Sequence, residues 1–363
     1  MIKKVNALIF FVCLILSCSE TAIAQLGLDP EYRYIKVGLE YDDNVTREKL
    51  DKDHQQGMIW RLNAAVGIRN IIPIDRLNTR LAYILGMRDV NNTNQEDFNS
   101  HDIKFGSSAK ITQSTRISFE EAFRKWNSQN DLFNFINNVA DAKIDQEIGK
   151  RTTAYISYRT EQKWFQNNAP EIQARNYLYH QFRMGINHSI SEDFTVQLGY
   201  ADQLRMYNRR PIDYRKGRPI ALKGIQKDRQ KVIILGFYAV VFNNTSLALS
   251  DQIVNSDSNS RGFSFDGNKT QVFLSSNPVQ KLWLDFTYQL AAYTVGAYQT
   301  PDLGYELSET RTEDQSFIRF GLTYDVSDQV SLKFNYERVK NTIFFTRDFY
   351  NSNIANVGMN VKF

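Results

Sequence analysis

Four histidines are the side chains of this sequence best suited to act as a general base or metal ligand near neutral pH. His54 and His101 lie in or near long polar stretches, while His180 and His188 share one face of the segment NYLYHQFRMGINHSI (176–190). A hydrolase would need a nucleophile within hydrogen-bond reach of such a base. The sequence contains no Gly-x-Ser-x-Gly, His-Glu-x-x-His, glycine-rich phosphate loop or clustered metal ligands. We therefore expect no catalytic residue, metal site or cofactor, unless His180 lies beside a serine or carboxylate.

Charged side chains gather in two stretches. The acidic stretch DDNVTREKLDKDH (42–54) lacks the Asp spacing and the downstream glutamate of a calcium loop. The basic stretch 208–230 carries eight Lys or Arg side chains against two Asp. As an extracellular loop it can enter a pore as a constriction, bind acidic polysaccharide or lipopolysaccharide phosphate, or remain solvated at the surface. The candidate binding or constriction residues are Arg209, Arg210, Arg215, Lys216 and Arg218.

An export signal opens the chain. Lys3 and Lys4 precede an apolar run at 5–16, which is too short to span a bilayer, and Ala22-Ile23-Ala24 fits a small-x-small cleavage site. Residues 1–24 are therefore predicted to be a cleaved signal peptide, with the mature chain at 25–363. The alternative is a lipoprotein with Cys18 lipidated. Cys13 and Cys18 both precede the predicted cut, so the mature chain would have no disulfide and no thiolate metal site.

Composition limits the possible partners. The formal net charge is only +4, which favours no nucleic-acid partner. The mean hydropathy of -0.44 resembles that of a soluble protein. A transmembrane barrel gives the same average, because only every second residue of each strand faces lipid.

Period-two alternation of apolar residues runs along the chain, and sixteen segments can be read in this way. Clear examples are 58–68, 77–87, 282–290 and 318–326. The alternation is weakest at 116–146, and the segment 231–241 is apolar on both faces. The prediction is an all-β fold of about 16 strands, with 14 or 18 as alternatives.

The connections between these segments alternate between short and long. Seven short ones occur near 70–75, 112–115, 149–151, 191–193, 243–244, 277–280 and 327–329, and eight longer polar stretches separate them. Short turns at one end and long loops at the other are typical of outer-membrane barrels. We therefore predict a transmembrane antiparallel up-and-down β-barrel in the bacterial outer membrane, with both termini periplasmic. The alternative, a soluble sandwich, has no such bias in loop length.

The two registers predict what the barrel presents outside and inside. Aromatic residues of the apolar register, such as Tyr83, Tyr158 and Tyr336, are expected to form girdles at the membrane interfaces. The other register is polar and more basic than acidic, which predicts a wet lumen with a mild preference for anionic solutes. The alternative is that these charges pair with one another. The candidate lumen-lining residues are Arg61, Arg80, Arg183, Arg319, Lys333 and Glu337.

The C-terminal stretch NSNIANVGMNVKF alternates up to Phe363. It is predicted to be the closing strand, paired with residues 33–43, and a recognition tag for the outer-membrane insertion machinery. Outer-membrane lipid and lipopolysaccharide are the other expected partners.

The segment GLEYDDNVTRE (38–48) carries a Tyr-Asp-Asp-Asn-hydrophobic pattern, and a polar loop at 91–101 and ISFEEAF (117–123) follow it. In these features residues 33–363 resemble the β-barrel porin 2 family. The resemblance implies an outer-membrane barrel often associated with exopolysaccharide production and export, and it brings no catalytic residues. From the residues themselves we expect Asp42, Asp43 and Asn44 to shape a turn or line a loop.

Two functions are consistent with these features. The favoured one is a porin-like channel or conduit for polysaccharide or small anionic solutes. The alternative is a non-conducting structural or adhesion barrel whose extracellular loops bind a partner.

Overall fold

In the computed structural model the chain is described at residues 29–44, 56–72, 74, 76–91, 97–128, 134–210, 212–215, 218–242, 244–260, 263–295, 298–300, 305–307, 311–341 and 350–363. The predicted signal peptide, its cleavage site and Cys18 lie outside these residues.

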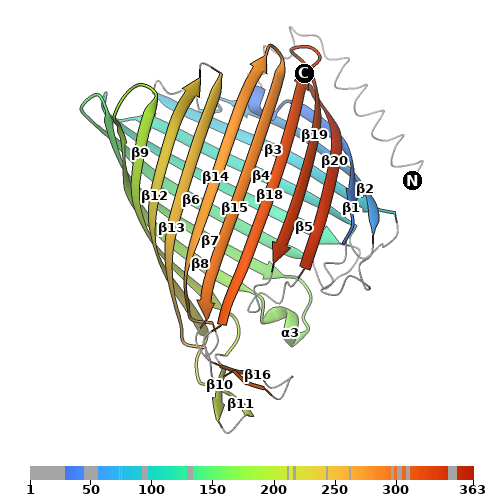
Figure 1. Ribbon diagram of the computed structural model, residues 1–363, viewed down its shortest axis with the longest axis vertical. Helices are drawn as coiled ribbons and strands as arrows, with labels where there is room; N and C mark the ends of the chain where they lie inside the picture. Colours follow the sequence, from blue (N-terminus) through green and yellow to red (C-terminus); the bar gives the residue numbers. More distant parts are fainter. Residues whose placement is uncertain are drawn as a thin grey trace.

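Sixteen antiparallel strands form one closed barrel (Figure 1). Each strand pairs with the preceding and following barrel strand of the chain, and the last pairs with the first. The predicted up-and-down barrel of sixteen strands is confirmed. In chain order the strands are β1 (Tyr34–Asp42), β2 (Gly57–Arg69), β3 (Leu77–Val90), β4 (Phe98–Lys110), β5 (Thr115–Ser128), β6 (Phe135–Ile148), β7 (Thr152–Phe165), β8 (Tyr177–Ser189), β9 (Phe194–Tyr207), β12 (Gln226–Phe242), β13 (Thr245–Ser258), β14 (Phe265–Val279), β15 (Leu282–Val295), β18 (Arg311–Asp325), β19 (Val330–Asn341) and β20 (Tyr350–Lys362).

The two ends of the barrel differ in their connections. Short turns join strands at the end where the chain terminates, and three of them contain residues in the left-handed conformation, such as Arg76 at φ 72°, Gly149 at φ 69° and Lys281 at φ 72°. At the opposite end lie the helix α3 (Pro170–Gln173), the hairpin of β10 (Ile212–Arg215) and β11 (Arg218–Ala221), and β16 (Tyr298–Thr300), which pairs with β17 (Tyr305–Leu307) (Figure 1). Short periplasmic turns and long extracellular connections are the arrangement of outer-membrane barrels.

Apolar side chains of the outward register surround the barrel. Ile186 of β8 and Leu198 of β9 are 47% and 57% exposed, and they pair in register on the outer surface. Exposure of so many large apolar side chains would be costly in water and is stabilising against lipid. Among the described residues no helix is long and apolar enough to cross a bilayer. The chain is an outer-membrane barrel, and its strands cross the membrane.

Two regions in which alternation was hard to read are regular strands. In β5, Glu121 points outward and accepts a hydrogen bond from Asn138 of β6, while small Ala122 points inward. In β12, Val232 and Ile234 point inward and pack with Ala201, Val254 and Phe265 in a buried cluster on the inner wall. Because these strands carry polar residues on the outer face or apolar residues on the inner face, the alternation of apolar and polar residues could not be read from their sequence.

The prediction that the basic loop spans 208–230 is wrong at its C-terminal end. β12 begins at Gln226, and Lys227 and Arg229 lie in its ladder with β9. This part of the strand lies beyond the apolar belt, where both faces can be polar, so no alternation marked it as strand.

The first and last strands close the barrel, as predicted. Tyr34 to Asp42 pair with Lys362 to Ile354, and the Phe363 N–H donates to the Arg33 carbonyl at 3.3 Å. The apolar side of the C-terminal strand faces outward, as Val357 shows with 60% exposure.

Candidate functional site

The ladder register places all six candidate lumen-lining residues on the inner surface of the barrel. They are distributed over five strands: Arg61 on β2, Arg80 on β3, Arg183 on β8, Arg319 on β18, and Lys333 and Glu337 on β19. Their inward direction follows from the alternation, because their neighbours in sequence form the outer apolar belt. Their effect on solute passage remains a prediction.

Many of the lumen charges pair with a charge on a neighbouring strand. Arg61 donates to Glu40 of β1 at 2.7 Å, and Arg319 of β18 donates to Glu337 at 2.7 Å. Arg124 of β5 grips both carboxylate oxygens of Asp102 on β4, at 2.8 and 2.6 Å. Such planar two-point pairs hold the side chains along the wall. These residues follow the alternative expectation, which was that the charges of the lumen pair with one another.

Other lumen cations are not paired in this way. Within the part of the chain that the structure describes, Arg183 and Lys333 have no carboxylate at ion-pair distance. Lys36 of β1 and Lys362 of β20 face the lumen on the strands next to Lys333, since the closing register aligns β19, β20 and β1. The three lysines place positive charge on the inner wall near the periplasmic end.

Arg80 spans two strands at the periplasmic end of the lumen. Its guanidinium reaches over Gly106 of β4 and contacts Glu120 of β5 at 2.5 Å and Glu31 at 2.8 Å. A Cβ at position 106 would lie 2.6 Å from the Arg80 Nε, so glycine is what permits this path. The arginine therefore lies flat against the wall.

The N-terminal segment joins the same cluster. A short 3-10 turn, η1 (Pro30–Tyr32), is capped by Asp29, whose carboxylate accepts from the Glu31 N–H at 3.0 Å and lies 3.4 Å from Arg69. Burial raises the pKa of the Tyr32 phenol, with nearby Arg80 opposing that effect. Asp29, Glu31, Arg69 and Arg80 are among the residues that line a cavity of about 240 Å³.

A tyrosine lies against the wall in the same manner four strands further around the barrel. The hydroxyl of Tyr155 on β7 lies over Gly185 of β8 and close to Gly199 of β9, where a Cβ would approach it to 2.7 and 3.1 Å. Gln197 donates to this hydroxyl at 3.4 Å. Glycines on adjacent strands thus accommodate long side chains without narrowing the lumen.

An aromatic arc lines the lumen at the extracellular ends of six consecutive strands. Phe98 and Trp126 stack with ring centroids 3.6 Å apart, Trp126 and Phe135 at 5.5 Å, and Phe135 and Phe165 at 5.8 Å. Tyr177 and Tyr207 continue it with an edge contact at 6.1 Å. All six share the inward register, because each pairs with inward residues of the next strand.

Cations lie over the faces of these rings. Lys163 of β7 is 3.9 Å from the Phe135 centroid and 5.1 Å from that of Phe165. Arg205 of β9 lies 5.0 Å from the Tyr177 ring and 5.3 Å from the Tyr179 ring. These contacts are cation–π distances. The arc therefore combines apolar ring surface with positive charge.

The arc was not predicted from the sequence, because the aromatic residues were assigned to girdles on the outer surface. Trp126 and Phe135 lie in the region in which alternation was weak. Whether their side chains face the lumen or the lipid therefore follows only from the pairing with neighbouring strands. The signal available in the sequence was the recurrence of Phe or Tyr at predicted loop borders, as at Phe98, Phe165 and Tyr177.

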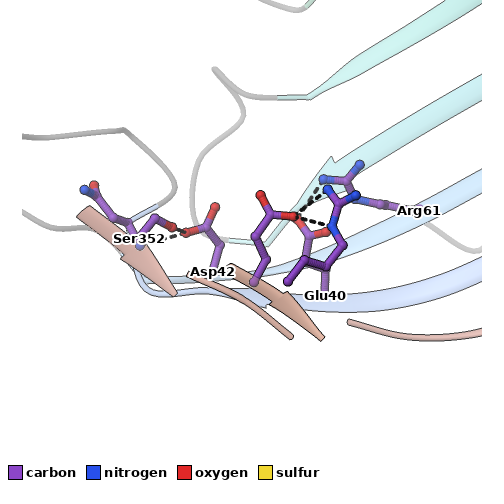
Figure 2. A network of polar contacts seen from close by, with 7 residues as sticks. Glu40, Asp42, Arg61 and Ser352 are labelled. Carbon is purple, nitrogen blue, oxygen red and sulfur yellow. Dashed lines mark hydrogen bonds and ion pairs between the residues drawn. The ribbon is translucent and has the colours of Figure 1, made fainter. Parts of the chain in front are cut away.

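The Asp-Asp-Asn motif joins the first strand to the last. Asp42 accepts from the Asn44 N–H at 2.9 Å, the predicted turn contact, and from the Ser352 hydroxyl at 2.6 Å. The carboxylate of Asp43 accepts from the backbone and the side-chain N–H of Asn353 at 2.7 and 2.6 Å. Figure 2 shows the Asp42–Ser352 contact beside the Glu40–Arg61 pair. The motif thus stabilises the closure of the barrel on its extracellular side.

The five residues of the basic loop separate into two groups. Arg209 lies at the rim, 4.6 Å from the Tyr207 ring and 5.2 Å from the Phe263 ring, and donates to Gln226 at 2.6 Å. Arg210 follows it and is exposed. Arg215 and Arg218 are paired positions at the end of the β10–β11 hairpin, which projects beyond the barrel in Figure 1. Lys216 lies outside the described residues.

The described histidines sit on the outer surface. His101 and His180 each lie 2.6 Å from a tyrosine hydroxyl, those of Tyr83 and Tyr158, in the middle of the strands. The expectation that these tyrosines belong to the interface girdles stays a prediction. His54 lies outside the described residues. Among the described residues no group of three or more His, Cys, Asp or Glu is placed to hold a metal.

Solved structures with a similar fold are bacterial outer-membrane proteins. OprB of Pseudomonas putida, in its high-pH structure, matches with a TM-score of 0.54 and 11% identity, over 94% of this chain and 96% of that one. In-vitro folded OmpT, an outer membrane protein of Vibrio cholerae, matches with a TM-score of 0.50 and 10% identity, over 93% and 97%. At these identities the likeness establishes the fold. No family model and no curated protein matches the chain.

Proposed function

We propose that this outer-membrane barrel is a porin-like channel that passes polar solutes through its lumen. The observation that carries the proposal is the arrangement of the long lumen side chains along the wall. Arg80 crosses Gly106 to reach Glu120, Tyr155 lies over Gly185, and Arg61, Arg124 and Arg319 pair with neighbouring strands. Barrels of sixteen strands are wide enough for an aqueous channel when side chains do not fill them.

A mild preference for anions belongs to the same proposal. Paired charges cancel over a short distance, so the unpaired cations determine the field that a solute meets. These cations include Lys36, Arg183, Lys333 and Lys362 on the inner wall. The resemblance to the β-barrel porin 2 family adds a proposed association with exopolysaccharide export, and the channel needs no catalytic group.

Single-channel recording after reconstitution into planar bilayers tests the proposal. Discrete conductance steps, with a reversal potential that shows anions to be more permeant than cations in a KCl gradient, are expected. A protein that migrates faster unboiled than boiled on a gel, and so is folded, but never conducts would refute the open channel.

The second candidate, an adhesion barrel, is favoured by the extracellular elements. The helix α3 and the hairpin β10–β11 extend beyond the rim, and the hairpin carries Arg215 and Arg218. Deletion of 209–224 discriminates between the functions. Altered conductance favours a channel with a loop at its mouth, whereas loss of surface binding in a protein that never conducts favours adhesion.

A further inference from the structure

The aromatic arc has three properties that a structural role on the wall does not require. Its six rings are only half-buried, so they present surface to the lumen. They lie on six adjacent strands, and ring contacts link the four from Phe98 to Phe165 and the two from Tyr177 to Tyr207. They lie at the extracellular mouth, where a solute meets the lumen.

The charges beside the arc leave a positive excess. Glu161 accepts from the Tyr177 hydroxyl at 2.6 Å and faces Arg159 at 3.8 Å, while Asp228 accepts from Gln226 at 3.0 Å and Ser258 at 2.5 Å. Asp102 is held by Arg124. Within the described residues Lys163 and Arg205 have no carboxylate at ion-pair distance, so their charge faces the lumen.

The wall next to the arc is hollowed. Tyr179, Arg205, Tyr207, Arg209 and Phe265 are among the residues that line a cavity of about 170 Å³. Phe265 packs edge-on against Tyr293 at 4.9 Å, which extends the aromatic surface beyond the arginines. The hollow is comparable in size with a single sugar ring and lies between ring faces and guanidinium groups.

We propose that the aromatic arc and its cations form a binding site for acidic oligosaccharides at the extracellular mouth of the lumen. Sugar rings have one face of C–H groups, which packs on aromatic rings, and hydroxyls that stay hydrated on the other side. Carboxylates of uronic acid units would meet Lys163 and Arg205 as charge-assisted hydrogen-bond acceptors. A row of rings across six strands presents several such faces side by side around the mouth to a chain of sugars. This inference names the solute class of the channel and rests on the proposed function.

The experiment uses the full-length reconstituted protein and two hexamers of similar size. Oligogalacturonate hexamer is the acidic probe and maltohexaose is the neutral probe, each added on the extracellular side of a bilayer while the blocking of single-channel current is recorded. The acidic hexamer is expected to block at a concentration about 10-fold lower than the neutral one. Equal blocking by both probes, or blocking by sulfate at the same concentration as the hexamer, would overturn the proposal.

Matched variants separate the rings from the charge. Trp126→Ala is expected to raise the half-blocking concentration of both hexamers about 5- to 10-fold, whereas Lys163→Gln raises that of the acidic hexamer alone. Trp164→Ala and Lys125→Gln alter the same residue types on the outer face and should change neither value. Phe135→Leu keeps an apolar side chain of similar volume and should still weaken the binding of both hexamers. No shift in either inward variant would refute the site.

Calorimetric titration of the detergent-solubilised protein keeps this inference distinguishable from the channel proposal. Heat of binding for oligogalacturonate in a protein that does not conduct would retain the site and refute the channel. Conductance without binding or blocking would retain the channel and refute the site.

Discussion

The hydroxyl of Ser352 on the last strand donates to the carboxylate of Asp42 on the first, at 2.6 Å, with both side chains almost fully buried. Because 310 residues separate the two, the contact forms only when the barrel closes. The sequence motif at the end of β1 therefore holds the first strand to the last.

Removal of this contact should destabilise the closed barrel. Asp42→Ala leaves the Ser352 hydroxyl and the Asn44 N–H without their acceptor, at an expected cost of about 1–3 kcal/mol in the free energy of unfolding. Urea unfolding in lipid vesicles measures it. Asp42→Asn retains an acceptor and should recover most of the loss, and Ser191→Ala in an exposed turn should stay within about 0.5 kcal/mol of the parent. An Ala variant as stable as Ser191→Ala would show that the contact contributes nothing.

Lumen charges should alter ion selectivity according to their sign. Lys333→Gln is expected to lower the ratio of chloride to potassium permeability, and Glu337→Gln to raise it, each by less than about threefold because salt screens beyond about 10 Å at 0.1 M. Reversal potentials in a KCl gradient give the ratio. The outward Lys125→Gln is the control, and a shift in it equal to that of Lys333→Gln would contradict the assignment of faces.

A side chain at position 106 should displace Arg80 from the wall and so change the conductance. In Gly106→Ala the new Cβ meets the arginine, not the backbone, so the guanidinium should turn into the lumen and lower single-channel conductance with little loss of stability. Gly106→Ala combined with Arg80→Ala should restore or exceed the parent conductance. If the double variant conducts as poorly as Gly106→Ala alone, the obstruction is not the arginine.

Cations on the outer face of β12 should contact lipopolysaccharide. Lys227, Arg229 and Lys231 point outward above the apolar belt, and Arg229 is held by Asp202 at 2.9 Å. Replacing Lys227 and Lys231 by Gln should remove about 1 kcal/mol per lysine of the stabilisation gained on moving from zwitterionic to lipopolysaccharide-containing vesicles. Lys150→Gln, in a periplasmic turn, should lose none. Equal losses in the two variants would point to a general charge effect.

The predicted signal peptide can be checked by the intact mass of the protein from outer membranes. A chain that begins at Gln25 is expected. A mass that retains Cys18 together with acyl chains would establish the lipoprotein alternative instead.

The turns could be predicted from the sequence because residues next to one another mark each turn. The closure could be predicted because the first and last strands each show their own alternation of apolar and polar residues. Six of the seven short turns fall where the sequence predicts them, and the seventh, between Val279 and Leu282, lies slightly later because Pro278 is still in β14. The limits of β12 could not be predicted, because Asp228 and Gln230 lie above the membrane, where neither face needs apolar residues.

The candidate site was predictable only in part, and for a physical reason. The inward direction of Arg61 or Arg319 follows from apolar neighbours in its own strand. The partner of each, and the glycine over which Arg80 passes, depend on strands that lie next to one another and therefore on the register. The inward direction of Trp126 likewise depends on the pairing of several strands, and the sequence of one strand does not determine it.

In the proposed channel, the glycines under Arg80 and Tyr155 make the size limit for a solute and the chemical selectivity for it two separate properties. Long side chains lie in recesses of the wall, so the hydrogen-bonded backbone determines the bore, and the size limit for a solute changes only when such a recess is filled. Exchange of the chemical groups along the wall can then alter which solutes are retained while the diameter stays constant. A channel of this construction can acquire a new cargo without being rebuilt.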